Sequence, residues 1–358
     1  MIKTYIKYLI YNFLKFFLFV FFIIFCLIII LNILSEIEFF KNYNVETYFP
    51  IYISILNSAD LIFEMYPFIF LLSTQIFFIY LINDNQIQIF KYSGLQNSKI
   101  VNIVSILSLI MGVIIITVFY SFSSNLKNLY LELKNKYTSD SEYLAVITKN
   151  GLWIKDIDNG NIKIINASKI DGNTLNDVFI SEFDQNYNLT RNIMSKKVDV
   201  SRKNWILIDG KIYEKNNSKK FEKYDFFSNF DIKKINDLYS DLSSLSLLEL
   251  LDLRKNYKQI NYSTIEVDLQ IHKLLSYPFY FTLMTIFASL IMFNTKGLNN
   301  NTLKILIGLF FSVVVYYINN FFYVLGKTEK MPMIASVWLP LIILSIINLS
   351  MIRKVNQK

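Results

Sequence analysis

The sequence predicts a helical membrane protein with six transmembrane spans and one inserted all-β domain. The 358 residues are 53% hydrophobic, and the apolar ones gather in blocks of about 20, the length that crosses a bilayer. A long stretch of ordinary polarity separates the third block from the fourth, and its short alternating runs between turn residues are typical of strands. We therefore expect spans one to three in residues 1–123, the β domain and a connecting helix in 124–268, and spans four to six in 269–358.

Each candidate span holds few or no charged residues. The spans are Asn12–Leu34, Leu61–Ile82, Val101–Phe122, Lys273–Phe293, Leu303–Leu325 and Met333–Ile352. The lysines around the first span raise the alternative of a signal peptide. Its apolar core is longer than the usual run of about 7–15 residues, and no small-x-small cleavage site follows. We expect it to remain as an anchor.

The distribution of charge predicts the topology. The net charge is +8, but residues 124–268 are nearly neutral. The excess of Lys and Arg lies at both termini and in the loops 83–100 and 294–304, which all fall on one side of six spans. The positive-inside rule makes that side cytoplasmic. Both termini are then inside, the β domain is outside, and the basic excess needs no nucleic acid to explain it.

The block 124–268 carries strand and turn signals. Alternating apolar runs are separated by Lys-Asn-Gly at 149–151, Asn-Gly at 159–160 and Asp-Gly at 209–210. Such spacing is typical of a sandwich, a jelly roll or an open barrel. Ser246 and Glu249 fit a capping box, which predicts a helix leading to the fourth span.

No catalytic motif is found in the chain. Gly326-Lys327-Thr328 could end a phosphate-binding loop, but Phe321 occupies the position of its first glycine. His272 is the only histidine and Cys26 the only cysteine, so neither has the companions of a metal site or a disulfide. We expect the chain itself to be no enzyme and to bind no cofactor or metal.

Asp60 and Glu64 are separated by one helical turn ahead of Pro67. They fit either a helix end in the headgroup zone or a protonatable pair that faces a cavity. The residues alone leave both interpretations open.

The loop "NDNQIQIFKYSGLQNSKI" at 83–100 predicts a short amphipathic helix over 84–94. Asn83 can cap it, with Gln86 reaching back, and Gly94 suits the left-handed position that ends a helix. Ile87 and Phe90, with Ile89 beside them, form a narrow apolar stripe. This stripe can lie on the bilayer or insert into a groove on a soluble partner.

Several strings resemble a known family over nearly the whole chain. They are "QIQIFKYSG" at 86–94, "NGLWIKD" at 150–156, "DLQIHKLLSYPF" before the fourth span and "MPMIASVWLP" before the sixth. Together they resemble the lipopolysaccharide-export ABC transporter permeases LptF and LptG, and the Gly-Leu-Trp and Trp-Leu-Pro strings are closer to LptG. The resemblance implies a jelly-roll-like periplasmic domain and a multi-pass protein of the bacterial inner membrane.

The resemblance also implies partners and a division of labour. A heterodimer with a second LptF/LptG-type permease, a separate LptB-like ATPase that binds the ATP, and an LptC-like protein would together pass lipopolysaccharide from the outer leaflet to a β-jelly-roll bridge. The helix in the 83–100 loop would be the coupling helix that docks on the ATPase. Its docking residues would be Gln86, Ile87, Ile89, Phe90, Lys91 and Gly94. The family usually has Glu where this chain has Gln86, which removes a charge from that contact.

Candidate substrate contacts lie near the outer end of the first span and on the fifth. They are Glu36, Glu38, Lys41, Tyr316, Tyr317 and Asn320. Each also fits the role of an interfacial anchor, since aromatic and charged residues gather at membrane surfaces.

Three other functions stay open from the residues. One is a mechanotransmitting ABC permease of the MacB or FtsX kind, which has four spans per subunit. The others are a membrane sensor with an outer β domain and a structural scaffold.

Overall fold

The computed structural model describes residues 3–135, 137, 144–148, 151–158, 161–185, 187–214, 217–230, 242–259, 263–295, 297 and 300–353. The chain forms two compact units. The membrane unit comprises Met1–Tyr130 with Leu269–Lys358, and the β unit comprises Leu131–Asp268. The first division falls within a helix, because the third span continues as helix to Asn135.

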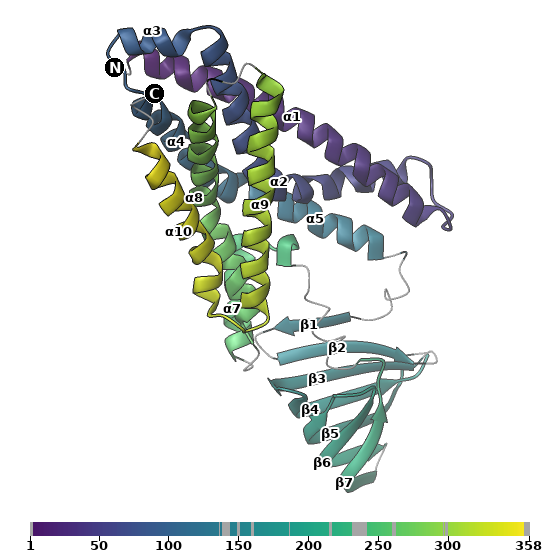
Figure 1. Ribbon diagram of the computed structural model, residues 1–358. Helices are drawn as coiled ribbons and strands as arrows, with labels where there is room; N and C mark the ends of the chain where they lie inside the picture. Colours follow the sequence, from purple (N-terminus) through teal and green to yellow (C-terminus); the bar gives the residue numbers. More distant parts are fainter. Residues whose placement is uncertain are drawn as a thin grey trace. The chain divides into compact units, whose positions relative to one another are not determined.

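Over its described residues, all the regular secondary structure of the membrane unit is helical (Figure 1). Six helical stretches are long and apolar enough to cross a membrane, which confirms the predicted number. The elements are α1 (Thr4–Phe40), α2 (Phe49–Asn83), α3 (Gln86–Tyr92), α4 (Asn97–Ile114), the π-helical η1 (Ile115–Phe119), α5 (Tyr120–Asn135), α8 (Ile265–Asn294), α9 (Asn301–Lys327) and α10 (Met333–Ile352). The third span is continuous through α4, η1 and α5.

Helix α2 begins at Phe49, well before the predicted start of the second span. Hydropathy misses this first part because it contains Ser54, Asn57, Ser58 and Asp60, all of which are buried. Their polar groups find partners inside the unit: for example, the Ser58 hydroxyl donates to the Ser54 carbonyl at 2.6 Å. Since paired polar groups are tolerated in a buried helix, the helix continues through them.

Close helix packing depends on small residues where backbones meet. A Cβ atom on Gly112 of α4 would lie 2.8 Å from Cα of Pro278 on α8, so only glycine allows this approach. Nearby, the rings of Phe70 on α2 and Phe281 on α8 stack with centroids 5.0 Å apart. Small residues at such crossings are characteristic of membrane helices.

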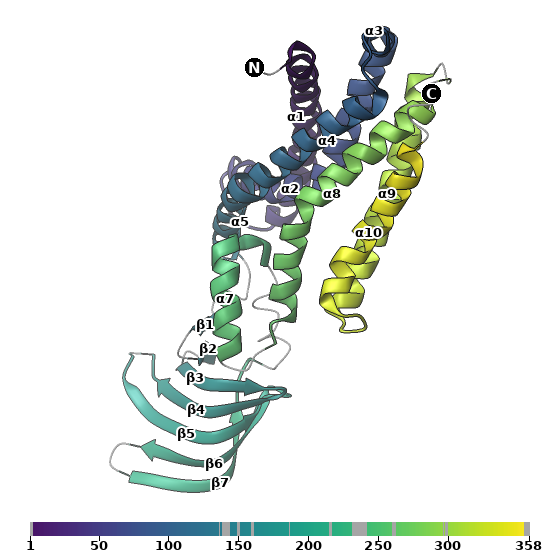
Figure 2. The same ribbon diagram turned by 90° about the vertical axis from the view of Figure 1, so that its left-hand side faces the viewer.

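The described strands of the β unit form one antiparallel sheet in which each strand pairs with its neighbour in sequence (Figure 2). The strands are β1 (Leu144–Thr148), β2 (Gly151–Asp158), β3 (Asn161–Asp171), β4 (Thr174–Phe183), β5 (Leu189–Asp199), β6 (Asn204–Glu214) and β7 (Asn217–Phe227). The inserted all-β domain is thus confirmed, with the strand order of a meander. The predicted turn residues 149–150 and 159–160 lie outside the described residues.

The two faces of the sheet differ in polarity. Ile154, Ile165, Ile180 and Ile193 stand in register on four adjacent strands and are buried. Trp205, near the start of β6 and away from this row, is also buried and donates its indole N–H to the Phe230 carbonyl at 2.7 Å. On each strand, the residues next to the isoleucine point to the opposite face of the sheet, which is more exposed.

The predicted turn at Asp209-Gly210 is wrong, because both residues lie inside β6. Asp209 has a φ of 53°, and the alternation of faces shifts by one residue at this level of the sheet. Ser195 on β5 stabilises the irregularity, since its hydroxyl lies 2.8 Å from the Lys197 carbonyl and 2.9 Å from the Ile208 carbonyl. Asp and Gly are common in turns because they tolerate left-handed backbone, and here the Asp-Gly pair uses that property inside a strand.

A capped helix follows the sheet, as the sequence predicts. The Glu249 carboxylate accepts from the backbone N–H of Ser246 at 2.8 Å, and the Ser246 hydroxyl lies 3.4 Å from the Glu249 nitrogen. This capping box begins α7 (Leu247–Gln259).

Candidate functional site

Helix α3 ends as its sequence predicts. Gly94 has a φ of 77°, the Leu95 nitrogen donates to the Phe90 carbonyl at 2.9 Å, and the Gly94 nitrogen donates to the Lys91 carbonyl at 2.9 Å. This pair of bonds is the Schellman arrangement. The glycine fixes the length of the helix and the direction in which the chain leaves it.

The start of α3 differs from the prediction. Asn83 is the last residue of α2, so it does not cap the next helix, and Asn85 makes the junction with a left-handed φ of 57°. Gln86 instead turns towards α1: its side-chain oxygen accepts from the Tyr8 hydroxyl at 2.8 Å. The Tyr8 hydroxyl also lies 3.2 Å from that of Tyr80. Gln86 therefore ties α3 to the first span and does not close a capping box.

The predicted apolar stripe of α3 divides between two sides. Ile87 is 1% exposed and packs within the membrane unit, and the ring of Phe90 meets that of Tyr8 edge-on at 6.4 Å. Ile89 is 58% exposed and Tyr92 is 89% exposed, with Lys91 also exposed between them. The surface that α3 offers to another molecule thus includes these three residues, with the exposed Gln88 beside them.

Charged residues near the end of α1 have different surroundings. Glu36 is buried and accepts from the Tyr130 hydroxyl at 2.9 Å. Glu38 and Lys41 are exposed. Of the three predicted substrate contacts on α1, the structure therefore leaves two open at the surface and engages Glu36 inside the unit.

Asp60 and Glu64 face different cations. Asp60 lies 3.5 Å from the Lys127 ammonium, which also donates to Asn57 at 2.8 Å. Glu64 lies 3.6 Å from the Lys273 ammonium. Each carboxylate therefore has its own cation, and Glu64, unlike Asp60, lines the cavity described next.

That cavity lies in the membrane unit among α2, α8, α9 and α10 and has a volume of about 440 Å³. It brings together two of the three residues predicted on the fifth span, Tyr316 and Asn320. Tyr317 projects elsewhere and is exposed. Lys273 and Tyr323 line the same cavity. The sequence does not predict this, because Lys273 lies on α8 and Tyr323 lies on another turn of α9.

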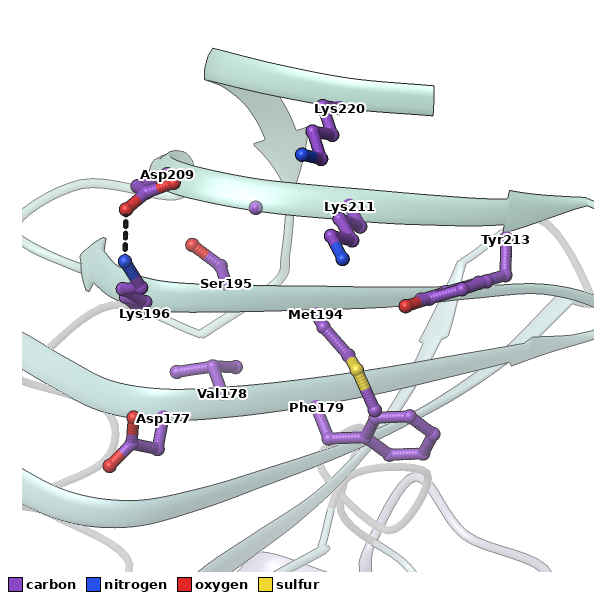
Figure 3. Close-up of a pocket in the computed structure, with 11 residues that line it drawn as sticks. Asp177, Val178, Phe179, Met194, Ser195, Lys196, Asp209, Lys211, Tyr213 and Lys220 are labelled. Atoms are coloured by element: carbon purple, nitrogen blue, oxygen red, sulfur yellow. Dashed lines mark hydrogen bonds and ion pairs between the residues drawn. The ribbon is translucent and has the colours of Figure 1, made fainter. Parts of the chain in front are cut away.

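A second hollow, of about 600 Å³, lies on the exposed face of the sheet (Figure 3). Phe179, Met194, Lys211 and Lys220 form one register row across β4, β5, β6 and β7. Tyr213 lies beside this row. Apolar side chains and two adjacent lysines are thus placed together, which favours an amphiphilic anion over a neutral ligand.

An ion pair closes one end of this hollow. The Lys196 ammonium lies 2.6 Å from the Asp209 carboxylate (Figure 3). The hydrogen bond and positive charge of Lys196 lower the pKa of Asp209, and the same contact raises the pKa of Lys196. Both groups stay charged near neutral pH. Asp177 also lines the hollow, so its three lysines outnumber its two aspartates by one positive charge.

Comparison with known families matches nearly the whole chain to one family. The sequence model of the family described as lipopolysaccharide export system permease LptF/LptG matches residues 7–354. No curated protein matches the chain significantly. The family model joins LptF and LptG, so the closer likeness to LptG stays a prediction. Among the residues with described positions, no group of three or more His, Cys, Asp or Glu could hold a metal ion.

Proposed function

The chain belongs to the LptF/LptG family of lipopolysaccharide export permeases, and we propose that it extracts lipopolysaccharide from the outer leaflet of the inner membrane and delivers it to a periplasmic β-jelly-roll bridge. The observation that carries this proposal is the family match, which spans all six membrane helices and the β unit. Six candidate spans also argue against the four-span mechanotransmitting permeases.

ATP hydrolysis would take place in a separate LptB-like ATPase docked on α3. The exposed face of Ile89, Lys91 and Tyr92 supports this role, because it presents an apolar side chain and an aromatic ring, and aromatic residues are enriched at protein interfaces. Phe90 and Ile87 would act from within, by joining α3 to the membrane unit. The contact between Gln86 and Tyr8 would then pass a displacement of α3 to α1.

A second LptF/LptG-type permease would cover the first and fifth spans. Within their most apolar segments only 17% of α1 and 11% of α9 is buried by the rest of the chain, compared with 72% of α8. These two helices are therefore the least covered and are suited to face a partner permease and the lipid between them. An LptC-like protein is expected in the same assembly.

Two exposed cationic places fit the path of a phosphorylated lipid. Lys41 near the end of α1 can meet a phosphate as a point charge. Lys211 and Lys220 stand beside the apolar side chains of Met194 and Phe179 on the sheet. We propose that the lipid meets Lys41 in the membrane and the sheet hollow in the β unit.

Reconstitution tests the proposal. Proteoliposomes that contain the full chain, a second permease and an LptB-like ATPase should release lipopolysaccharide to a soluble β-jelly-roll acceptor only when ATP is present. Vesicles without this chain should release none, and the chain alone should hydrolyse no ATP. Equal release with and without the chain would overturn the proposal.

A further inference from the structure

The cavity among α2, α8, α9 and α10 is strongly polar for a membrane protein. Its lining includes Tyr277, Tyr280, Tyr316, Asn319, Asn320 and Tyr323. Ionisable and amide side chains gathered inside a membrane unit mark a site that holds water or a polar ligand. A volume of about 440 Å³ is within the range of about 300–1,000 Å³ that ligand pockets occupy.

The charges in the cavity are one of each sign. Among its lining residues that the structure describes, Lys273 and Glu64 alone are charged. Their atoms lie 3.6 Å apart, which is longer than the roughly 2.7–2.9 Å of a charge-assisted hydrogen bond. The two groups attract each other without a short hydrogen bond between them, so each keeps the capacity to bond to a ligand. The Glu64 side chain is 50% exposed, so its carboxylate can be reached.

Aromatic rings surround these charges. The Lys273 ammonium lies 5.8 Å from the centroid of Tyr277 and 5.4 Å from that of Tyr323. Tyrosine rings near a carboxylate also favour an organic ammonium ion. Lys273 and Glu64 already balance each other, so a ligand with two negative charges would leave an unbalanced charge in a medium of low dielectric. A zwitterion, which has one charge of each sign, matches this cavity better.

The position of the cavity matches a lipid headgroup. Lys273 begins the predicted fourth span, and Tyr323 lies near the outer end of the predicted fifth. The predicted topology therefore puts the cavity at the outer interface, where headgroups lie. Helices α9 and α10 both have largely exposed apolar surfaces, which gives acyl chains a place to lie beside them.

We propose that this cavity binds the headgroup of a phosphoethanolamine phospholipid, with Lys273 on the phosphate and Glu64 on the ammonium. The lipid is distinct from the exported lipopolysaccharide. The assignment does not depend on export, because a bound phospholipid can be measured on the full chain alone.

Native mass spectrometry of the full chain tests the proposal, with phosphatidylethanolamine, phosphatidylcholine and phosphatidylglycerol offered in equal amounts. Loss of one charged hydrogen bond is worth about tenfold in affinity. We therefore expect about tenfold greater retention of phosphatidylethanolamine than of phosphatidylglycerol. Phosphatidylcholine, whose ammonium carries no N–H group, should fall between them. Retention of soluble phosphoethanolamine as strong as that of the phospholipid would overturn the assignment to a lipid.

Variants distinguish a change in lipid preference from a general loss of lipid retention caused by a folding defect. Glu64→Gln should abolish the preference for phosphatidylethanolamine and shift retention towards phosphatidylglycerol, because Lys273 still binds the phosphate of either lipid. Lys273→Gln should lower retention of both lipids. Asp60→Asn makes the same carboxylate-to-amide change one turn earlier on α2, outside the cavity, and should retain the preference. Equal behaviour of Glu64→Gln and Asp60→Asn, or no lipid preference in the natural chain, would refute the site.

Discussion

Replacing Ile89 by Asp tests which face of α3 meets the ATPase. Ile89 is 58% exposed, and fully burying an Ile side chain contributes about 1.5–3 kcal/mol. Docking can bury at most the exposed part, so the lost apolar contribution is about 1–2 kcal/mol. That range corresponds to about 5- to 30-fold weaker binding, and the cost of desolvating the new carboxylate adds to it.

Titration of an LptB-like ATPase onto the full chain and its partner permease in nanodiscs would measure this effect. Gln88→Asp is the matched control. Gln88 is an exposed residue of the same helix, and its replacement by Asp adds the same charge without removing an apolar group. Gln88 lies one helical turn from the exposed Tyr92, so we expect Gln88→Asp to weaken binding only by the cost of the new charge, and by less than Ile89→Asp. If Ile89→Asp bound within about twofold of the control, the exposed face of α3 would not be the docking surface.

Three further predictions concern packing, ionisation and transfer. Gly112→Leu should destabilise the full chain by about 1–3 kcal/mol through overpacking against α8, seen as a lower Tm in detergent, whereas Gly297→Ala, which faces open space, should not. An NMR titration should find the Asp209 pKa below its ordinary value, and Lys196→Gln should bring it back. The attraction within this pair is lost as pH falls through the lowered Asp209 pKa or rises through the raised Lys196 pKa. Lys211→Glu should slow ATP-dependent lipopolysaccharide transfer several-fold in proteoliposomes, and an unchanged rate would exclude the sheet hollow from the path.

Sequence periodicity predicts the features that depend on local chemistry. Long apolar blocks identify six spans, Gly94 identifies the end of α3, and Ser246 with Glu249 identifies the start of α7. In each case the determining contacts lie within a few residues of one another. The pattern therefore contains all the information that the prediction needs.

Features that depend on contacts between distant segments are not predictable in the same way. The stripe of α3 is visible in sequence, but only packing decides that Ile87 faces inward and Ile89 outward. Asn83 has the chemistry of a cap, yet α2 extends to include it. Likewise, Asp209-Gly210 has turn chemistry inside a strand, where the register of the neighbouring strands overrides the local signal.

Helix α2 connects these separate observations into one mechanical element. It continues almost directly into α3, with only Asp84 and Asn85 between them, so a force applied by an ATPase to α3 acts on α2 first. One turn apart, α2 carries Asp60 and Glu64, which are paired with lysines on α5 and α8 respectively. The Asp60–Lys127 pair is largely buried, so α5 is expected to follow α2 when it moves, whereas the half-exposed Glu64 links α8 to α2 more weakly. A phospholipid headgroup between Glu64 and Lys273 would bridge the looser of these two electrostatic connections. The same cavity that recognises a lipid would therefore determine how strongly α8 follows the ATPase-driven movement of α2.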